Sequence, residues 1–297
     1  MWRADDNADM IPQALPDVDI EGVPGRRGPA LARYAQFSFA HGSDVHAVYH
    51  LGERSAPPIL ILPELAGFAP GQMLFAERLV EKGFQVYLPW LLGPLGQRAY
   101  LSNALRLCVS REFGRLRAGV TAPVTLWLRA LVTHISAHNG RGGVAAIGMC
   151  LTGAFVIPLL LHPEVTAAVA AQPAVPLSLS FLALGLGGES RRQALNVARA
   201  DIEQARDRLA SGAARLLAVR CAADRVCPAD KLLRLQAEFP VGLTLRTYGA
   251  ADSRNALGDR PHATYTKEFR LATGAGAEHW SRQAFADLVQ FLRGGLA

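Results

Sequence analysis

The sequence places a cysteine where a strand is expected to end and a helix to begin. Residues 145–155, AAIGMCLTGAF, run from small and β-branched apolar residues through Gly148, Cys150 and Gly153 into a second apolar stretch. A nucleophile on a sharp strand-to-helix turn needs small neighbours, because the two backbones approach closely and strain the central residue. A helix that begins at Leu151 would aim its first amides at the sulfur and offer a donor to an oxyanion. Cys150 is therefore a candidate nucleophile, and the alternative is a buried structural cysteine.

The residues after this cysteine depart from the simple glycine-x-nucleophile-x-glycine spacing. Thr152 stands where the second glycine is expected, and the glycine follows at position 153. The departure weakens the motif without removing the small residue that a close helix–strand approach requires.

An acid is expected on a later loop. Asp224 lies just past a predicted strand at residues 215–220, where a carboxylate can orient an imidazole. The alternative is an ordinary turn aspartate. The neighbouring Asp230 is expected to cap the helix that follows.

Two histidines compete for the role of base. His262, in the loop after a predicted strand at 243–247, follows Cys150 and Asp224 in the chain order nucleophile, acid, histidine that α/β enzymes of this kind use. His279 stands at the start of the last predicted helix, where a capping or packing role is enough to explain it. We favour His262.

The elements that must position these side chains alternate along the chain. A hairpin is predicted at 34–39 and 45–49, and from residue 58 short buried strands alternate with helices. The strands are predicted at 58–62, 84–88, 144–148, 166–171, 215–220 and 243–247, and the helices at 72–82, 124–139, 151–161, 195–210, 229–237 and 281–293. This order predicts a mainly parallel sheet between helices, with ligands at the carboxyl ends of the strands.

The N-terminal residues differ from the rest of the chain. Residues 1–32 are rich in Asp, Pro and Gly without periodicity and are predicted to form an irregular extension, while residues 33–297 are predicted to form one α/β domain. The acidic start lacks the positive charge and apolar run of a secretory signal, so we predict a cytoplasmic protein.

Charge and hydropathy exclude two classes of partner. The formal charge of +6 comes from scattered arginines mixed with acids rather than from a block, which is not typical of a nucleic-acid surface. The uncharged stretches 144–161 and 165–188 are interrupted by Gly, Pro, Thr, Ser and Gln, and are interpreted as buried strands and helices rather than membrane spans.

No metal or cofactor is predicted. His134 and His138 have the spacing of zinc ligands on one helix face, but no glutamate adjoins the first. Cys221 and Cys227 are too far apart for a redox pair, and no dinucleotide-binding glycine pattern is present. The four cysteines, which include Cys108, are predicted to be free thiols.

The sequence resembles the dienelactone hydrolases, a branch of the α/β-hydrolase fold that uses a cysteine nucleophile. The resemblance rests on GMCLTG at 148–153, ADRVCP at 223–228, PH at 261–262 and ILILPELAG at 59–67, and with the element order it covers residues from about 35 to the end. It implies a hydrolase of esters or lactones with a Cys-His-Asp triad and a thioester intermediate, acting on a small molecule without a cofactor.

The resemblance also assigns residues beyond the triad. It implies that Glu64, directly after the early strand, interacts with the thiol and takes its proton when substrate arrives, and that the backbone amides of Leu65 and Leu151 form the oxyanion hole. The family holds its substrate's carboxylate with arginines, one of them four residues after the histidine, where this chain has Thr266. Arg111 is a candidate cation from another loop. Residues 176–185 are a candidate apolar lining for the mouth of the active site, which would suit a more apolar substrate.

Two other functions stay open from the sequence. One is thioester hydrolysis or acyl transfer at the same site, and the other is a non-catalytic binding module on a hydrolase scaffold. The sequence does not identify the substrate, the acyl acceptor or the oligomeric state.

Overall fold

The computed structural model describes residues 33–92, 120–174, 194–195, 197–272 and 279–296. The predicted N-terminal extension, Cys108, Arg111 and the candidate mouth at 176–185 lie outside these residues.

Eight strands form one sheet in the order β1-β2-β4-β3-β5-β6-β7-β8, antiparallel at β1-β2 and β2-β4 and parallel elsewhere. Their bounds are β1 Ala35–His41, β2 Asp44–Leu51, β3 Pro58–Ile61, β4 Gln85–Pro89, β5 Val144–Met149, β6 Val165–Ala171, β7 Arg215–Cys221 and β8 Leu243–Tyr248. The predicted N-terminal hairpin and the mainly parallel α/β-hydrolase-like sheet are confirmed.

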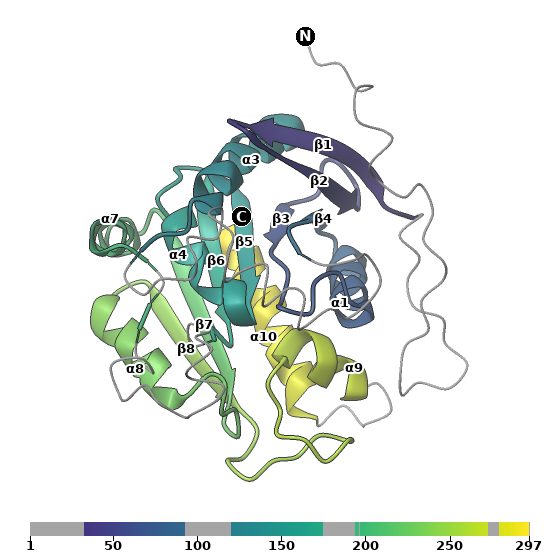
Figure 1. Cartoon of the computed structure of the whole chain (residues 1–297), viewed down its shortest axis with the longest axis vertical. Coiled ribbons are helices and arrows are strands. Elements are labelled where there is room, and N and C mark those ends of the chain that lie inside the picture. The colour runs from purple at the N-terminus through teal and green to yellow at the C-terminus, as the bar shows by residue number, and fades with distance from the viewer. Residues whose placement is uncertain (1–32, 93–119, 175–193, 196, 273–278, 297) are drawn as a thin grey trace.

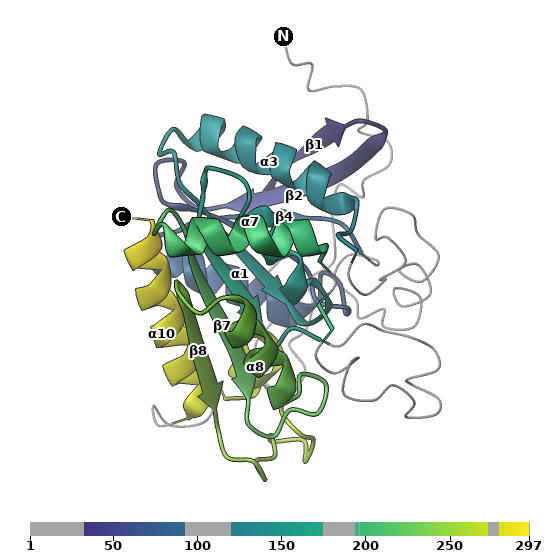
Figure 2. The same ribbon diagram turned by 90° about the vertical axis from the view of Figure 1, so that its left-hand side faces the viewer.

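Helices cover both faces of this sheet (Figure 1, Figure 2). The longer ones are α1 Pro70–Glu81, α3 Val124–Asn139, α7 Arg199–Ala210, α8 Ala229–Glu238 and α10 Trp280–Gly295. Successive strand residues point to opposite faces: Leu60 and Ala146 pack with α3, α7 and α8, whereas Ile59 and Ile147 pack with α1 and α10. The central strands are therefore buried on both sides, which explains their continuous hydrophobic runs.

Local signals account for the ends of two of these helices. Pro70 occupies the first turn of α1, where its missing amide hydrogen costs nothing. Gly140 ends α3 in the left-handed conformation, with φ of 78°, and its amide donates to the carbonyl of Ser136.

Two predicted helices are wrong in extent. The stretch 151–161 forms a 3₁₀ turn, η4 Cys150–Ala154, followed by the short helix α4 Val156–Leu159. The tighter turn arises because the Thr152 hydroxyl bonds the amide of Met149 and because Gly153 packs closely against Pro173. The helix predicted at 195–210 begins only at Arg199, since Ala198 is extended and its amide donates to Thr121 Oγ1.

The uncharged stretch 144–161 is accounted for by β5, η4 and α4. In the part of the chain that the structure describes, no helix has the length and apolar character needed to cross a membrane.

Candidate active site

Five neighbouring strands each lead into one polar side chain at the same edge of the sheet. Glu64 follows β3, Cys150 follows β5, Gln172 follows β6, Asp224 follows β7 and His262 lies in the loop after β8. Because these strands are parallel and adjacent, their carboxyl ends meet at one edge, which is where such sheets bind ligands. Glu64, Cys150 and His262 line a common cavity of about 300 Å³.

The turn that carries Cys150 is strained. Its φ of 54° is unusual for a residue with a side chain and projects the sulfur from the turn between β5 and η4. A Cβ on Gly148 would collide with the carbonyl oxygen of Thr152, and a Cβ on Gly153 would lie 2.8 Å from Cα of Pro173. Both glycines are therefore required by close backbone approach, as the sequence motif predicts.

Thr152, the departure from the simple motif, has a structural role in this turn. Its buried hydroxyl accepts the amide of Met149 at 3.0 Å and lies 3.0 Å from the carbonyl oxygen of Pro63, to which it donates. It thus joins the nucleophile turn to the residue before Glu64, a function that a glycine at this position cannot supply.

Asp224 is held rigidly beside the imidazole. One carboxylate oxygen accepts the amides of Val226 and Cys227 at 2.8 and 3.0 Å, and the other lies 2.7 Å from Nδ1 of His262. Its side chain has no exposed surface. Since an ionised carboxylate only accepts hydrogen bonds, the hydrogen between the two groups is on Nδ1 of His262. The other ring nitrogen, Nε2, is not used by Asp224.

His262 is strongly biased toward its protonated form. Burial lowers its pKa, but Cys150 and Asp224 more than offset this effect and hold the pKa well above the ordinary value of 6.5. Its Nε2 is buried and makes no well-formed hydrogen bond within the described residues. This nitrogen is the ring atom available to Cys150 and to a reacting group, since hydrogen bonds of this kind commonly tighten only when substrate binds.

Glu64 lies in a hydrogen-bonded cradle. Thr266 Oγ1 lies 2.9 and 3.0 Å from its two oxygens, and Gln172 Nε2 donates to one of them at 3.2 Å. Burial raises the pKa of Glu64, while His262 and these two hydrogen bonds act in the opposite direction. The carboxylate is therefore positioned by Gln172 and Thr266, and it is electrostatically coupled to His262.

Three residues support the site in ways that the sequence does not predict. Gln172 is fully buried with φ of 36°, and the signal for it was its place directly after a strand, like the other site residues. Thr266 lies on a π-helical turn, η5 Thr264–Glu268, a rare element that often occurs at functional sites. Arg220 donates to the carbonyls of Cys227, Ala222 and Asp224 and braces the acid loop from within.

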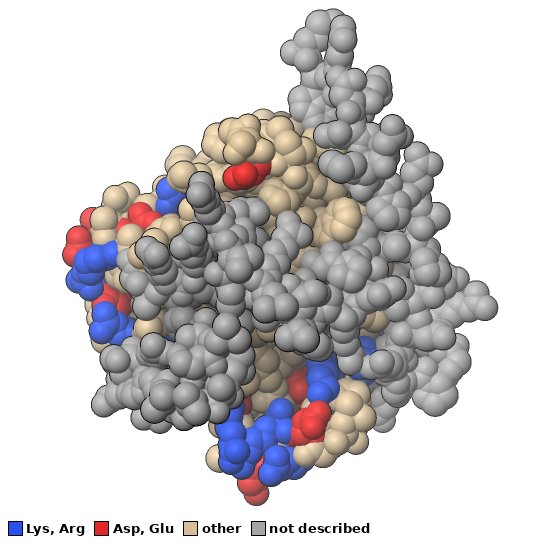
Figure 3. All heavy atoms as spheres, in the orientation of Figure 1, with Lys and Arg blue, Asp and Glu red and all other residues tan. Residues whose placement is uncertain are grey.

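The rim of the cavity is basic. Arg225 and then Arg254 lower the pKa of Arg260, a cavity-lining residue, because like charges disfavour its protonated form. Figure 3 shows Lys and Arg side chains, with a few acids, gathered at the lower edge of the molecule, where the loop after β8 lies in Figure 1. Among the described residues, the charged ones that line the cavity are the basic Arg260, Lys267 and Arg270 and the acidic Glu64 and Glu268, so basic side chains are in excess by one.

The structure also places the other residues to which the sequence assigns a role. Leu65 lines the cavity and Leu151 is buried beside Cys150, so both stay candidates for the oxyanion hole. His279 is the N-cap of α10 and its ring accepts the amide of Ser281, which confirms a capping role. Asp230 is in the first turn of α8 but is not its cap, because Pro228 occupies that position and cannot offer a side-chain acceptor.

The other described cysteines are buried and free, as predicted. Burial raises the pKa of Cys221 to about 12 and also raises the pKa of Cys227. These two thiols are therefore poor nucleophiles, whereas Cys150 is the described cysteine that lines the cavity.

His134 and His138 pack in an aromatic cluster. Their rings stack with centroids 6.3 Å apart, and His134 also contacts Phe37 and Phe39 of β1. Among the described residues, no group of three or more His, Cys, Asp or Glu side chains is arranged to hold a metal.

Comparison with solved structures shows many with the same fold. A dienelactone hydrolase candidate from Klebsiella pneumoniae has a TM-score of 0.58 and 14% identity, over 88% of this chain and 98% of that one. The Pyrococcus furiosus esterase Pf2001 has a TM-score of 0.57 and 12% identity, over 89% and 93%. A dienelactone hydrolase-like promiscuous phosphotriesterase from metagenomic libraries has a TM-score of 0.51 and 15% identity, over 87% and 98%.

Sequence comparison identifies the family. No curated protein sequence matches the chain. The model of the dienelactone hydrolase family matches residues 46–233, more than half of the chain, a range that includes Glu64, Cys150 and Asp224 and ends before His262. With the α/β-hydrolase fold, this match places the chain in the dienelactone hydrolase family, whose members are hydrolases acting on ester bonds.

Proposed function

We propose that this protein hydrolyses carboxylic esters or lactones through a covalent thioester on Cys150, with His262 as acid and base and Asp224 as the group that orients it. The observation that carries the proposal is the alignment at one sheet edge. Cys150, on a strained turn, lines the same cavity as the His262 imidazole, and that imidazole lies 2.7 Å from the buried carboxylate of Asp224. This arrangement has the nucleophile, base and orienting acid that covalent acyl transfer requires.

In the acylation step, the S–H bond of Cys150 breaks as its proton passes to Nε2 of His262. The resulting thiolate attacks the carbonyl carbon and forms the new C–S bond while the carbonyl π electrons move to oxygen. The backbone amides of Leu65 and Leu151 would donate to that oxyanion. As it collapses, the bond to the alkoxide breaks and His262 supplies the proton that the leaving oxygen takes.

In the second step, His262, now neutral, removes a proton from water as the oxygen attacks the thioester carbonyl. The C–S bond breaks, the carboxylic acid leaves and the sulfur regains the proton held by the imidazole. No redox partner or metal is needed to balance either step.

We assign Glu64 a supporting role in proton transfer. It lines the same cavity as Cys150, and burial raises its pKa, so it keeps a proton to a higher pH than an exposed glutamate does. Its hydrogen bonds within the described residues are to Thr266 and Gln172, which hold the carboxylate in place within the cavity.

The basic rim supports a substrate that carries negative charge away from the scissile bond. Arg260 lines the cavity, and Arg225 and Arg254 lie near enough to influence it. Arg111, outside the described residues, stays a candidate for the same task.

The test is hydrolysis of a panel of activated esters and small lactones, each in an anionic and a neutral form. Cys150→Ala is expected to lower kcat/KM by at least about 10³-fold. Cys227→Ala, which removes a buried thiol near Asp224, is the control and should keep most of the activity. Equal rates for wild type and Cys150→Ala would contradict the proposal. Product analysis with an added thiol or amine separates hydrolysis from acyl transfer.

A further inference from the structure

The proposed base, His262, lies on a long irregular segment. Residues 249–263 connect β8 to η5 and contain no helix or strand. Such segments are generally more mobile than the elements that they connect, whereas a base acts only within hydrogen-bonding distance of the proton it takes. Asp224 holds the imidazole from one side, 2.7 Å from Nδ1. The main chain that carries the imidazole needs a separate support.

A closed turn around Asn255 shapes this segment just before the base. The side-chain oxygen of Asn255 accepts the amides of Leu257 and Asp259 at 3.0 and 3.1 Å, and its carbonyl oxygen accepts the amide of Gly258 at 2.9 Å. Gly258 has a φ of 79°, a conformation that favours glycine. The turn is therefore a compact unit that can be held at one point.

Glu268 joins this turn to the base. One carboxylate oxygen of Glu268, Oε1, accepts the side-chain amide of Asn255 at 3.2 Å. The same oxygen lies 3.4 Å from the main-chain nitrogen of His262, which donates to it. Glu268 is buried, with 2% of its surface exposed. The Asn255 turn and the main chain of His262 thus meet at a single buried oxygen atom.

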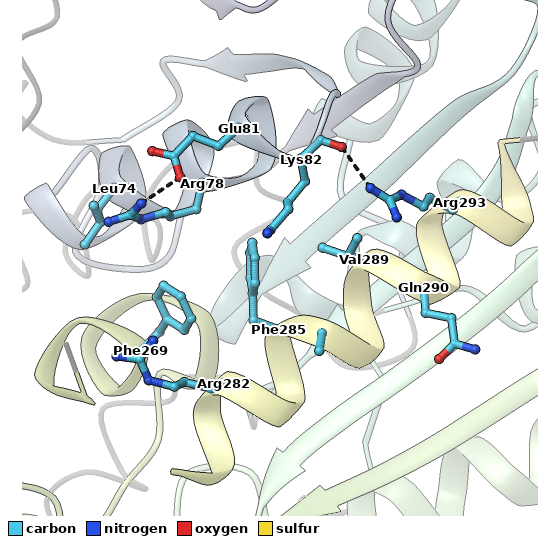
Figure 4. Close-up of a pocket in the computed structure, with 11 residues that line it drawn as sticks. Leu74, Arg78, Glu81, Lys82, Phe269, Arg282, Phe285, Val289, Gln290 and Arg293 are labelled. Atoms are coloured by element: carbon cyan, nitrogen blue, oxygen red, sulfur yellow. Dashed lines mark hydrogen bonds and ion pairs between the residues drawn. The ribbon is translucent and has the colours of Figure 1, made fainter. Parts of the chain in front are cut away.

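The turn that carries Glu268, η5, is packed against two helices. The buried ring of Tyr265 stacks on Phe75 of α1, with centroids 5.4 Å apart. Directly after Glu268, Phe269 begins the short helix α9 Phe269–Leu271, and its ring centroid lies 4.9 Å from that of Phe285 on α10. Figure 4 shows Phe269 and Phe285 in the cavity between α1 and α10. Aromatic packing therefore fixes η5 on both sides of the site residues that it carries.

The same turn also holds the second titratable group of the site. The hydroxyl oxygen of Thr266, two positions before Glu268, lies 2.9 and 3.0 Å from the two carboxylate oxygens of Glu64. One short element thus contacts both the side chain of Glu64 and the main chain of His262. This double contact gives a physical reason for a π-helical turn here, because such turns are rare and often occur at functional sites.

We propose that Glu268 is a positioning residue for the base: its carboxylate oxygen fixes the main chain of His262 relative to η5 and so keeps Nε2 directed at the reacting groups. In this role Glu268 acts through His262 rather than on the substrate. The inference rests on the proposed function, because it takes His262 to be the base.

The two hydrogen bonds to Glu268 need an oxygen atom rather than a negative charge. Burial raises the pKa of Glu268, whereas Asn255, the amide of His262, Lys267 and the imidazole lower it. A glutamine has the same length and keeps a side-chain oxygen that accepts hydrogen bonds. Glu268→Gln is therefore the conservative variant, and Glu268→Ala removes the support.

Steady-state hydrolysis of an activated ester compares these variants. Glu268→Ala is expected to lower kcat at least about tenfold and to change KM less than about twofold, because a displaced base slows the chemical step more than it weakens binding. Glu268→Gln is expected to keep kcat within about threefold of wild type. Asn255→Ala breaks the same support from the other side and is expected to lower kcat about fivefold, which also tests the proposal if Glu268→Ala does not fold.

The matched control is Glu238→Ala, which removes another buried glutamate. Glu238 lies on α8, where its partners are Arg199, Arg206 and Arg234. This variant is expected to lose stability but to keep kcat within about twofold of wild type, since these contacts do not involve the base.

Hydrogen–deuterium exchange of residues 255–263, read by mass spectrometry, measures the support without catalysis. Exchange is expected to be at least about tenfold faster in Glu268→Ala than in wild type and unchanged in Glu268→Gln. If Cys150→Ala and His262→Ala hydrolyse the ester as fast as wild type, the proposed function fails.

The positioning role fails under different results. One is that Cys150→Ala and His262→Ala lose activity while Glu268→Ala or Asn255→Ala keeps the kcat of wild type. Another is that Glu268→Gln loses as much kcat as Glu268→Ala, and a third is that Glu268→Ala leaves the exchange of residues 255–263 unchanged.

Discussion

The two titratable groups His262 and Glu64 of the catalytic cavity have raised pKa values for opposite reasons. Burial lowers the pKa of His262, but Cys150 and Asp224 prevail and raise it. Burial raises the pKa of Glu64 and prevails over the effect of His262 and the hydrogen bonds from Thr266 and Gln172. A charged partner decides the first case and desolvation decides the second, yet both shifts favour the protonated form. The cavity is therefore arranged to retain protons for transfer.

The largest expected effect comes from removing His262, the proposed base. His262→Ala is expected to lower kcat/KM for an activated ester by about 10³-fold or more, because acid and base catalysis are both lost. The matched control, His279→Ala, removes an N-cap of α10 and should lower stability slightly while kcat/KM changes less than about twofold. A reversed order of the two effects would assign the base to His279.

Asp224→Asn is expected to lower kcat by about 10²-fold or more, because the amide that replaces the carboxylate no longer fixes the tautomer of His262. It also has a pH signature. A histidine whose folded pKa is raised stabilises the fold fully below its ordinary value of 6.5 and loses that contribution as pH rises through the folded pKa. The difference in unfolding free energy between wild type and variant should therefore shrink as pH rises, as measured by urea denaturation. A difference in unfolding free energy that increases with pH would contradict this expectation.

The link between the Cys150 turn and the segment that carries Glu64 is tested at Thr152. Thr152→Val leaves the buried Met149 amide without its acceptor and cuts the contact to Pro63, so it should cost about 1–3 kcal/mol of stability and about tenfold in kcat. Thr125→Val removes another buried threonine hydroxyl, in α3, where it donates to Ala122. A similar loss of stability without a loss of kcat in Thr125→Val would show that the Thr152 effect is local to the site.

The basic rim makes a smaller contribution. Arg260→Ala is expected to raise KM for an anionic ester by about three- to tenfold and to leave a neutral ester nearly unchanged, because the guanidinium would act only on the distant charge. Steady-state kinetics on the matched ester pair measure both values. Equal changes for the two esters would indicate a structural role for Arg260.

The smallest expected effect concerns Glu64 itself. Because its folded pKa is raised, stability is lost as pH rises through that pKa, and Glu64→Gln removes the loss. The variant should therefore gain stability over wild type with increasing pH above the ordinary value of 4.5, while Thr266 and Gln172 keep a side chain to contact. Thermal unfolding of both proteins at several pH values measures this stability difference. A variant that becomes less stable relative to wild type as pH rises would contradict the prediction.

The Cys150 turn and the surroundings of Glu64 also differ in how far the sequence predicts them. The Cys150 turn is a local feature, so glycine spacing and strand–helix alternation were sufficient to find it, and chain order then indicated Asp224 and His262. Glu64 came only from the family resemblance. Gln172 and Thr266 were missed because their roles depend on three separated segments meeting around Glu64, and nothing within each segment records that meeting. The η4 turn was predicted as a longer helix because the bond from Met149 to Thr152 is not visible as periodicity.

The most direct test of the account is rapid-quench mass spectrometry with an activated ester in excess. The account predicts a transient acyl adduct that peptide mapping places on Cys150, formed before steady-state turnover, and absent from Cys150→Ala. Steady hydrolysis by wild type with no adduct, or an adduct on a different residue, would contradict the central claim that Cys150 is the nucleophile.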